Sequence, residues 1–209
     1  METLTFGQML RTSLVMPVLL VLSVLVVAQA LERLWAFWVA NRLPVKTWER
    51  IKRRLDKGDK DGALGVCRQT EGIVCEAIHR ILVLPDPDTE KIIEVFQLYR
   101  QRLQLDMSRR LGFFGTVSFI SPLIGLMGTV LGIMRAFHDL AIAGAGGPAV
   151  VAAGISEALV ATAAGIGVAV VSAVMYNYFT FTVRHRLSTV DLWVFELADI
   201  LVRGRGQVP

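Results

Sequence analysis

One acidic residue lies where the sequence is otherwise almost continuously apolar. Glu157 falls inside a run of apolar and small residues that extends from about Val151 to Phe181. In a membrane span a charge costs on the order of 2.5 to 3.5 kcal/mol on insertion scales, and ionisable residues kept there commonly serve ion or proton pathways. Apolar surroundings favour the neutral carboxyl, which is the form that can release a proton. Glu157 is therefore a candidate proton-exchanging group.

Two threonines could contribute hydroxyl groups to the same pathway. Thr162 follows Glu157 in the same run, and Thr129 lies in another apolar run rich in small residues, earlier in the chain. Each hydroxyl can hydrogen-bond water or a protonated carboxyl, although a threonine in a helix also bonds readily to its own backbone. For Glu157 the alternative is a structural role, either solvated near the membrane interface or paired with a neighbour such as Arg135. The sequence leaves these alternatives open.

Small residues recur every three or four positions in both runs. This spacing places them on one face of each helix, and such stripes allow membrane helices to approach closely. Gly128 and Gly132 form a GxxxG pair. We expect helix packing to involve Gly125, Gly128, Gly132, Ala158 and Gly165.

The composition indicates which class of protein must position these residues. Of the 209 residues, 54% are hydrophobic and only 19% are charged, which favours a membrane protein. A spanning helix needs roughly 20 apolar residues, and three windows qualify. We predict an all-α fold with three transmembrane helices at residues 14–38, 113–137 and 153–182, joined to long cytoplasmic helical extensions. The apolar run from about Val151 to Phe181 is longer than a bilayer requires, so this helix should tilt or project into water.

The distribution of basic residues predicts the orientation. Asn41 to Arg110 carries 15 of the 22 Lys and Arg residues, whereas His138 to Ala153 carries none. The positive-inside rule then places residues 39–112 and the tail 183–209 in the cytoplasm, with the N-terminus (1–13) and the loop 138–152 in the periplasm. The alternative is a cleaved signal peptide, since residues 28–30 read Ala-Gln-Ala after an apolar run. We favour an uncleaved span because the preceding residues carry no net positive charge.

Turn signals divide the cytoplasmic segment into helices. The sequence Asp-Lys-Asp-Gly at 59–62 marks one boundary, and Pro-Asp-Pro-Asp at 85–88 precedes a helix predicted to start near Thr89. From there, apolar positions at helical spacing lead into the second span without a breaker, so we expect one continuous helix. Cys67 and Cys75 are expected to be reduced thiols, neither a disulfide nor a zinc site.

Several classes of function lack support. The chain has no P-loop or other nucleotide-binding glycine pattern, which argues against an ATP-driven mechanism. We expect no enzymatic activity, no catalytic residues, no metal or organic cofactor and no nucleic-acid partner. A secondary transporter acting alone would require repeats and a midplane substrate site.

Two segments resemble signatures of the ExbB/TolQ branch of the MotA/TolQ/ExbB proton-channel family. Residues 121–134, SPLIGLMGTVLGIM, followed by Phe137, resemble PLLGLLGTVxGIMxxF. Residues 154–166, GISEALVATAAGI, ending in Tyr176-Asn177, resemble GIAEALxxTAxGLxxAIPAVxxYN. The order of span, large loop, span, short loop and span is also similar, and three spans favour this branch over the related four-span flagellar stators.

The resemblance implies a function and a set of partners. Such proteins form a pentameric ring around two copies of an ExbD/TolR-like single-span protein whose aspartate exchanges protons, in the bacterial inner membrane. Protons are the coupling ion, and a TonB-, TolA- or gliding-type effector would receive the work. The alternative is a membrane scaffold or transporter subunit without proton conduction.

The resemblance also implies roles for single residues. Thr129, Glu157 and Thr162 fall on channel-lining polar positions, and Pro122 falls on a helix-bending proline. One position departs from the family pattern, because Val171 stands where the family usually has a second proline. A proline there would bend the helix, so the inner half of the third helix is expected to be straighter in this chain.

Overall fold

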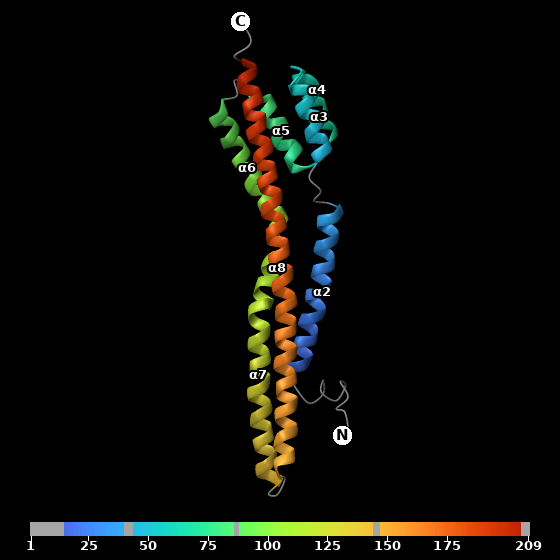
Figure 1. Cartoon of the computed structure of the whole chain (residues 1–209), viewed down its shortest axis with the longest axis vertical. Coiled ribbons are helices and arrows are strands. Elements are labelled where there is room, and N and C mark those ends of the chain that lie inside the picture. The colour runs from blue at the N-terminus through green and yellow to red at the C-terminus, as the bar shows by residue number, and fades with distance from the viewer. Residues whose placement is uncertain (1–14, 40–43, 86–87, 144–146, 206–209) are drawn as a thin grey trace. The chain divides into compact units, whose positions relative to one another are not determined.

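The computed structural model describes residues 15–39, 44–85, 88–143 and 147–205, so the predicted N-terminal segment 1–13 lies outside the described residues. All regular structure in the described part is helical, as predicted (Figure 1). The helices are α2 (Val15–Val39), α3 (Val45–Leu55), α4 (Lys60–Gln69), α5 (Ile73–Val83), α6 (Thr89–Ser108), α7 (Leu111–Ala143) and α8 (Gly147–Arg205).

Three of these helices are long and apolar enough to cross a membrane. The apolar stretches are Val15–Trp38 in α2, Leu111–Ile142 in α7 and Val151–Arg203 in α8. The chain therefore has the predicted three-span all-α membrane fold. Because α7 continues to Ala143, residues 138–143 of the predicted periplasmic loop are helical. At 59 residues, α8 is about 90 Å long and exceeds the roughly 30 Å of hydrocarbon in a bilayer.

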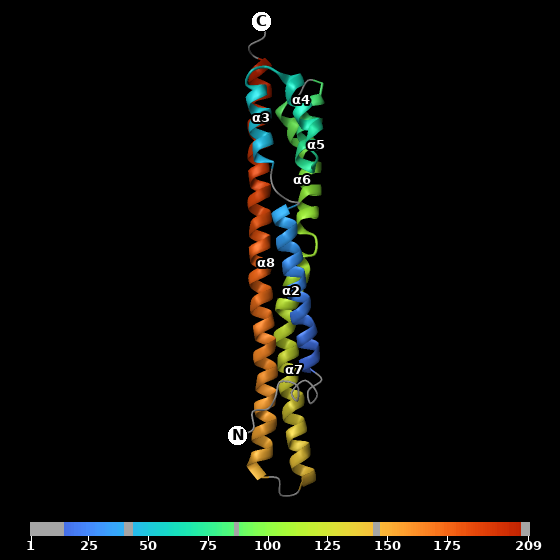
Figure 2. The same cartoon turned by 90° about the vertical axis from the view of Figure 1, so that its right-hand side faces the viewer.

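The chain divides into two compact units. The first contains α2 up to Phe37, α7, and α8 up to Phe179; the second contains α3 to α6 and the remainder of α8. In the first unit, α7 and α8 lie side by side in both views (Figures 1 and 2). They run antiparallel, since Gly125 of α7 lies against Thr162 of α8, whereas Gly132, farther along α7, lies against Ala158, which is earlier on α8.

The small-residue stripes lie where α7 and α8 touch. A Cβ atom added at Gly165 would lie 2.6 Å from the carbonyl oxygen of Ser121, and one added at Gly132 would lie 2.7 Å from the Cβ of Ala158. Side chains larger than hydrogen therefore do not fit at these positions without movement. Farther along, the Ser172 hydroxyl donates to the carbonyl oxygen of Phe114 at 2.9 Å, which adds a polar bond between the helices.

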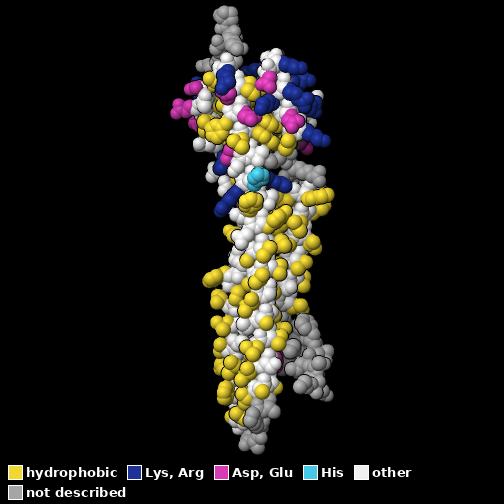
Figure 3. Space-filling model, in the orientation of Figure 1, with side chains coloured by type: hydrophobic (Ala, Val, Ile, Leu, Met, Phe, Trp, Pro, Cys, Tyr) yellow, Lys and Arg dark blue, Asp and Glu magenta, His cyan; other side chains and the backbone are white. Residues whose placement is uncertain are grey.

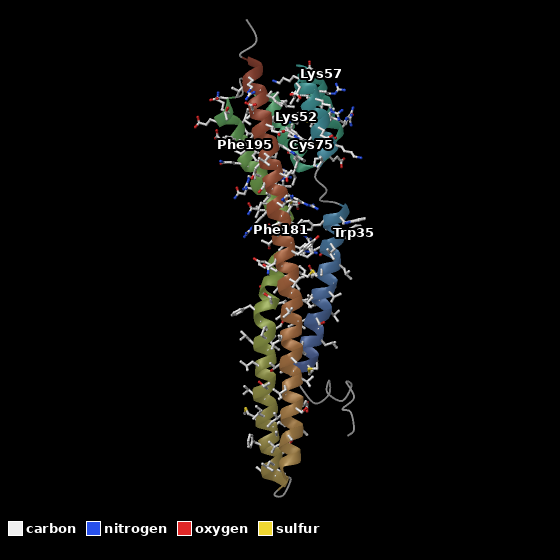
Figure 4. All side chains as sticks on the ribbon, in the orientation of Figure 1. Trp35, Lys52, Lys57, Cys75, Phe181 and Phe195 are labelled. Carbon is white, nitrogen blue, oxygen red and sulfur yellow. The ribbon has the colours of Figure 1, made fainter. Side chains whose placement is uncertain are left out.

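The outer surface of the first unit is apolar. Hydrophobic side chains cover its helices in Figure 3, and many large ones are exposed, including Val24, Leu31, Phe119 and Leu159. Such a surface is costly in water but fits hydrocarbon. At the end of α2, Trp35 is 67% exposed and points outward (Figure 4), as expected for an interfacial aromatic residue.

Aromatic stacking and ionic contacts hold the helices of the second unit together. Trp48 of α3 stacks on Trp193 of α8, with ring centroids 5.6 Å apart. The Arg100 guanidinium donates to both carboxylate oxygens of Asp191, at 2.7 and 3.0 Å, and this hydrogen bonding raises the pKa of Arg100. Aromatic stacking and the bidentate pair thus attach α3 and α6 to the end of α8.

The predicted turn signals begin helices in this unit. Asp59 caps α4 by accepting a hydrogen bond of 2.8 Å from the amide of Gly62. This bond, together with the Arg54 guanidinium, lowers the pKa of Asp59. Helix α6 begins at Thr89, and the side chain of Asp88 accepts from the Thr89 amide. Both boundaries follow the sequence prediction, although residues 86 and 87 lie outside the described part.

The predicted continuous helix into the second span is wrong. Helix α6 ends at Ser108, α7 begins at Leu111, and Arg110 between them has φ 65°. A left-handed conformation costs a non-glycine residue roughly 1 to 2 kcal/mol. No glycine or proline lies between Ser108 and Leu111 to signal this break. Instead, Arg110 forms an ion pair with Glu32 of α2, a tertiary contact that a local pattern cannot reveal.

Both cysteines lie in the second unit as free, buried thiols. Burial raises the pKa of Cys67 to about 12, with a smaller contribution from nearby Cys75, whose own pKa is also raised by burial. Within the described residues, no group of three or more His, Cys, Asp or Glu side chains is arranged to hold a metal ion. Because their pKa values are raised, these thiols are poor nucleophiles in the folded protein.

Candidate functional site

Thr162 connects the two small-residue helices. Its hydroxyl donates a 2.8 Å hydrogen bond to the carbonyl oxygen of Gly125, 37 residues away on α7. Gly125 makes this approach possible, because a Cβ there would lie 3.0 Å from the Cα of Thr162. The Thr162 hydroxyl is thus bonded between α8 and α7 instead of to its own helix.

Thr129 is bonded differently. Its hydroxyl donates to the carbonyl oxygen of Leu126, one turn earlier on α7, at 2.7 Å. This is the local bond that a helical threonine commonly makes. The side chain remains partly exposed, so the hydroxyl oxygen can still accept a hydrogen bond from another group.

Glu157 lies on α8, and its side chain is partly exposed. The next residue, Ala158, is buried against Gly132 of α7. Glu157 therefore lies beside the contact between the two helices.

Helix geometry relates Glu157 to Thr162. Five positions separate them, which is about 7.5 Å along the axis and about 140° around it. Since Thr162 bonds α7, the Glu157 carboxylate projects from a different side of α8. The structure thus places the three candidates on two adjacent helices without a direct bond among them. A group that contacts all three would have to approach from outside this helix pair.

Two further positions of the α7 interface bear on the site. Pro122 lies inside α7, where its missing N–H removes the hydrogen bond that the carbonyl of Ser118 would accept. The adjacent Ser121 side chain is fully buried, and its hydroxyl has no partner among the described residues. The Ser118 carbonyl and the Ser121 hydroxyl thus lack these hydrogen bonds within one to two turns of Gly125.

An apolar groove separates part of α2 from α8. Its volume is about 440 Å³, and its lining includes Leu20, Ser23 and Val27 of α2 and Gly167 and Val171 of α8. Val171 replaces the proline of the resembled signature, and α8 is helical through this position. Ser23 supplies the hydroxyl of an otherwise hydrophobic lining, which suits hydrocarbon better than a polar ligand.

Sequence reasoning missed a charged cluster within the first unit. Glu32 and Arg33 lie in the apolar stretch of α2, and Glu32 accepts hydrogen bonds from both Arg33 and Arg110. The signal was available as an acidic and a basic residue at the end of an apolar run. Because Trp35 and Trp38 follow directly, that end was interpreted only as an aromatic belt.

The arrangement brings together groups that can exchange or bind protons. It provides a carboxyl group on α8, a hydroxyl with spare accepting capacity on α7, and an interhelical hydroxyl bond. Together these can accept, donate or orient a proton carried by water or by another carboxyl.

Comparison with known proteins assigns a family to this architecture. Residues 68–191 match the profile of the MotA/TolQ/ExbB proton channel family, and this segment includes α7 and most of α8. An ExbB-like biopolymer transport protein of Synechocystis sp. is 32% identical over 179 residues, which cover 81% of this chain and 68% of the relative.

Two shorter matches are more similar in sequence. The Tol-Pal system protein TolQ of Pseudomonas aeruginosa is 38% identical over 96 residues, covering 46% of this chain and 42% of TolQ. The biopolymer transport protein ExbB of Salmonella typhimurium is 48% identical over 73 residues, covering 35% of this chain and 30% of ExbB. These two alignments therefore span less than half of either relative.

Proposed function

Because this chain belongs to the MotA/TolQ/ExbB proton channel family, ExbB/TolQ-like branch, we propose that it is the polytopic subunit of a proton-driven motor in the bacterial inner membrane. It couples proton flow to mechanical work on the envelope. The observation that carries the proposal is the closely packed pair α7 and α8, which holds Thr129, Glu157 and Thr162 among small residues.

The assembly is a ring of five copies of this chain around two copies of an ExbD/TolR-like single-span protein. Two features support a partner. The candidate residues project from more than one side of the helix pair, and the outer surface of the first unit is apolar over much of its area. In the ring, α7 and α8 of each copy line the centre, and the partner's span lies between them.

Both proteins contribute to the proton pathway. An aspartate in the partner's span carries the proton, and Glu157, Thr129 and Thr162 form its polar surroundings in this chain. Each proton that crosses releases about 2.3 kcal/mol per 100 mV of membrane potential. That energy drives rotation or rocking of the ring about the partner, and a TonB-, TolA- or gliding-type effector receives the work.

The orientation follows from the basic residues. The second unit, with α3 to α6 and the end of α8, lies in the cytoplasm, and the connection between α7 and α8 lies in the periplasm. Cysteine accessibility in intact cells tests this arrangement. A cysteine at the exposed position Asp139 should react with a membrane-impermeant reagent, whereas one at the exposed position Gln101 should react only after lysis.

Proton flux in vesicles tests the function. The chain is reconstituted alone and with its co-expressed single-span partner, and the internal pH is followed after a gradient is imposed. We expect flux only with the partner present. Equal flux without it would indicate a transporter, and no flux in the complex would indicate a scaffold. A monomer by mass measurement in mild detergent would contradict the ring.

A further inference from the structure

A compact charged cluster lies at the end of α2 that faces the start of α7. One Glu32 carboxylate oxygen accepts from the Arg33 guanidinium at 3.2 Å, and the other accepts from the Arg110 guanidinium at 2.9 Å. Two guanidinium groups therefore share one carboxylate, and the three side chains carry a net charge of +1. We call Glu32, Arg33 and Arg110 the arginine cluster.

Hydrogen bonding in this cluster is incomplete. The Arg33 side chain is only 8% exposed, and its Nε–H has no partner among the described residues. One turn earlier on α2, the buried Oε1 of Gln29 likewise has none. Burying an arginine with an unused donor is unfavourable unless another group completes its bonds. The cluster thus has both charge and hydrogen-bonding capacity to spare.

The start of α7 adds a second source of positive potential. Helix α7 has no acidic residue in its first turn, so its amino-terminal amides and helix dipole are not neutralised by its own side chains. The space where a Gly112 side chain would lie is empty within 4 Å, which leaves the backbone open to approach. Arg110 immediately precedes this turn in a left-handed conformation with φ 65°.

The arginine cluster lies at the level of the membrane interface. Trp35, which is 67% exposed and points outward (Figure 4), marks the interfacial end of the α2 span, and Arg33 lies within one turn of it. Arg110 directly precedes the apolar stretch of α7. Charged groups at this level lie next to the phosphates of membrane lipids.

We propose that the arginine cluster and the first turn of α7 bind the phosphate of an anionic phospholipid headgroup. Arg110, whose side chain is 49% exposed, pairs with the phosphate, and the buried Arg33 adds its positive charge behind it. The α7 amides add hydrogen bonds, and the acyl chains contact the apolar surface of the first unit. Arginine suits this role because its planar group binds phosphate oxygens in pairs. The proposal does not depend on proton conduction, and free phosphate has the same chemistry, so the test must separate the two sources.

The test measures lipid retention and thermal stability of the intact protein. The chain is placed in nanodiscs of phosphatidylcholine alone or with phosphatidylglycerol, and inorganic phosphate is added to the detergent-solubilised protein as a separate arm. We expect retained phosphatidylglycerol by native mass spectrometry and a higher Tm with phosphatidylglycerol. Equal behaviour in both lipids would overturn the proposal, as would a Tm that responds to inorganic phosphate alone.

Three variants distinguish a headgroup site from a structural ion pair. Arg110→Gln should lower phosphatidylglycerol retention at least several-fold, whereas Arg109→Gln, an equal charge change at the neighbouring exposed residue, should change it little. Glu32→Gln should increase retention, because it removes the carboxylate that competes with phosphate for the exposed Arg110 guanidinium. If Glu32→Gln lowers retention, or if Arg109→Gln lowers it as much as Arg110→Gln, the cluster is only structural.

Discussion

The hydroxyl of Thr162 and the carbonyl oxygen of Gly125 are joined by a 2.8 Å hydrogen bond between α8 and α7. This bond exists because Gly125 has no side chain, which brings the α7 backbone within reach of the threonine. Thr162 is consequently both a packing residue and a candidate for the proton pathway. Moving its hydroxyl toward another carboxyl requires breaking a bond that holds the two helices together.

Replacing Thr162 with valine should weaken both the helix pair and its activity. The isosteric change removes the interhelical hydrogen bond, worth about 0.5 to 1.5 kcal/mol, so the Tm in detergent should fall modestly. Proton-driven activity should fall at least several-fold. Thr162→Ser keeps the hydroxyl and should restore both in part. Unchanged activity of Thr162→Val would limit this residue to packing.

Replacing Thr129 with valine should separate activity from stability. Its hydroxyl donates to the Leu126 carbonyl of its own helix, a local bond of small energetic value. We therefore expect a Tm close to wild type but at least a several-fold loss of proton flux in vesicles, with Thr129→Ser partly restoring it. Wild-type flux in Thr129→Val would show that the hydroxyl serves only its own helix.

Adding one methyl group at Gly165 should destabilise the α7–α8 contact. The new Cβ would lie 2.6 Å from the Ser121 carbonyl oxygen, so backbone must move, at a cost of about 1 to 3 kcal/mol. Gly167→Ala is the matched control on the same helix, because no atom lies within 4 Å of its Cβ position apart from its chain neighbours and the backbone of its own helix. Thermal denaturation should show a lower Tm for Gly165→Ala only. Equal values would mean that the helices are not packed this closely.

Removing the Glu157 carboxyl should abolish motor-dependent function without dissociating the oligomer. Glu157→Ala is expected to retain the oligomer mass in mild detergent, because the side chain lies beside the helix contact instead of within it. Asp139→Ala, at an exposed acid on α7, should behave as wild type. Proton flux with the partner present is the measurement. Normal flux in Glu157→Ala would support the alternative that this side chain is solvated and has only a structural role.

Thiol labelling should depend on unfolding. With its pKa raised to about 12 by burial, Cys67 is almost entirely protonated at pH 8, so iodoacetamide should modify it only after denaturation. A cysteine introduced by Gln101→Cys is exposed and should react within minutes. The raised pKa also means that stability is retained below the usual thiol pKa of about 8.5 and declines as the pH rises above it. Rapid native labelling of Cys67 would contradict its burial.

Much of this fold could be read from the sequence because its signals are local. Long apolar stretches predict membrane helices, because a helix pairs its backbone groups within one segment and needs about 20 apolar residues to cross the bilayer. Asp59 and Asp88 begin helices by bonding amides one to three residues away. The two family signatures fixed the likeness to ExbB and TolQ, because long ordered motifs rarely recur by chance.

The tertiary structure alone decided the contacts between distant segments. The partner of the Thr162 hydroxyl is 37 residues away, and the break at Arg110 coincides with an ion pair to Glu32, 78 residues away. Neither contact leaves a local pattern, because each depends on how the helices rotate and pack against one another. Residue type and spacing therefore determined which helices form and which residues could carry protons. Packing determined which hydroxyl bonds which helix and left the Arg33 Nε donor without a partner among the described residues.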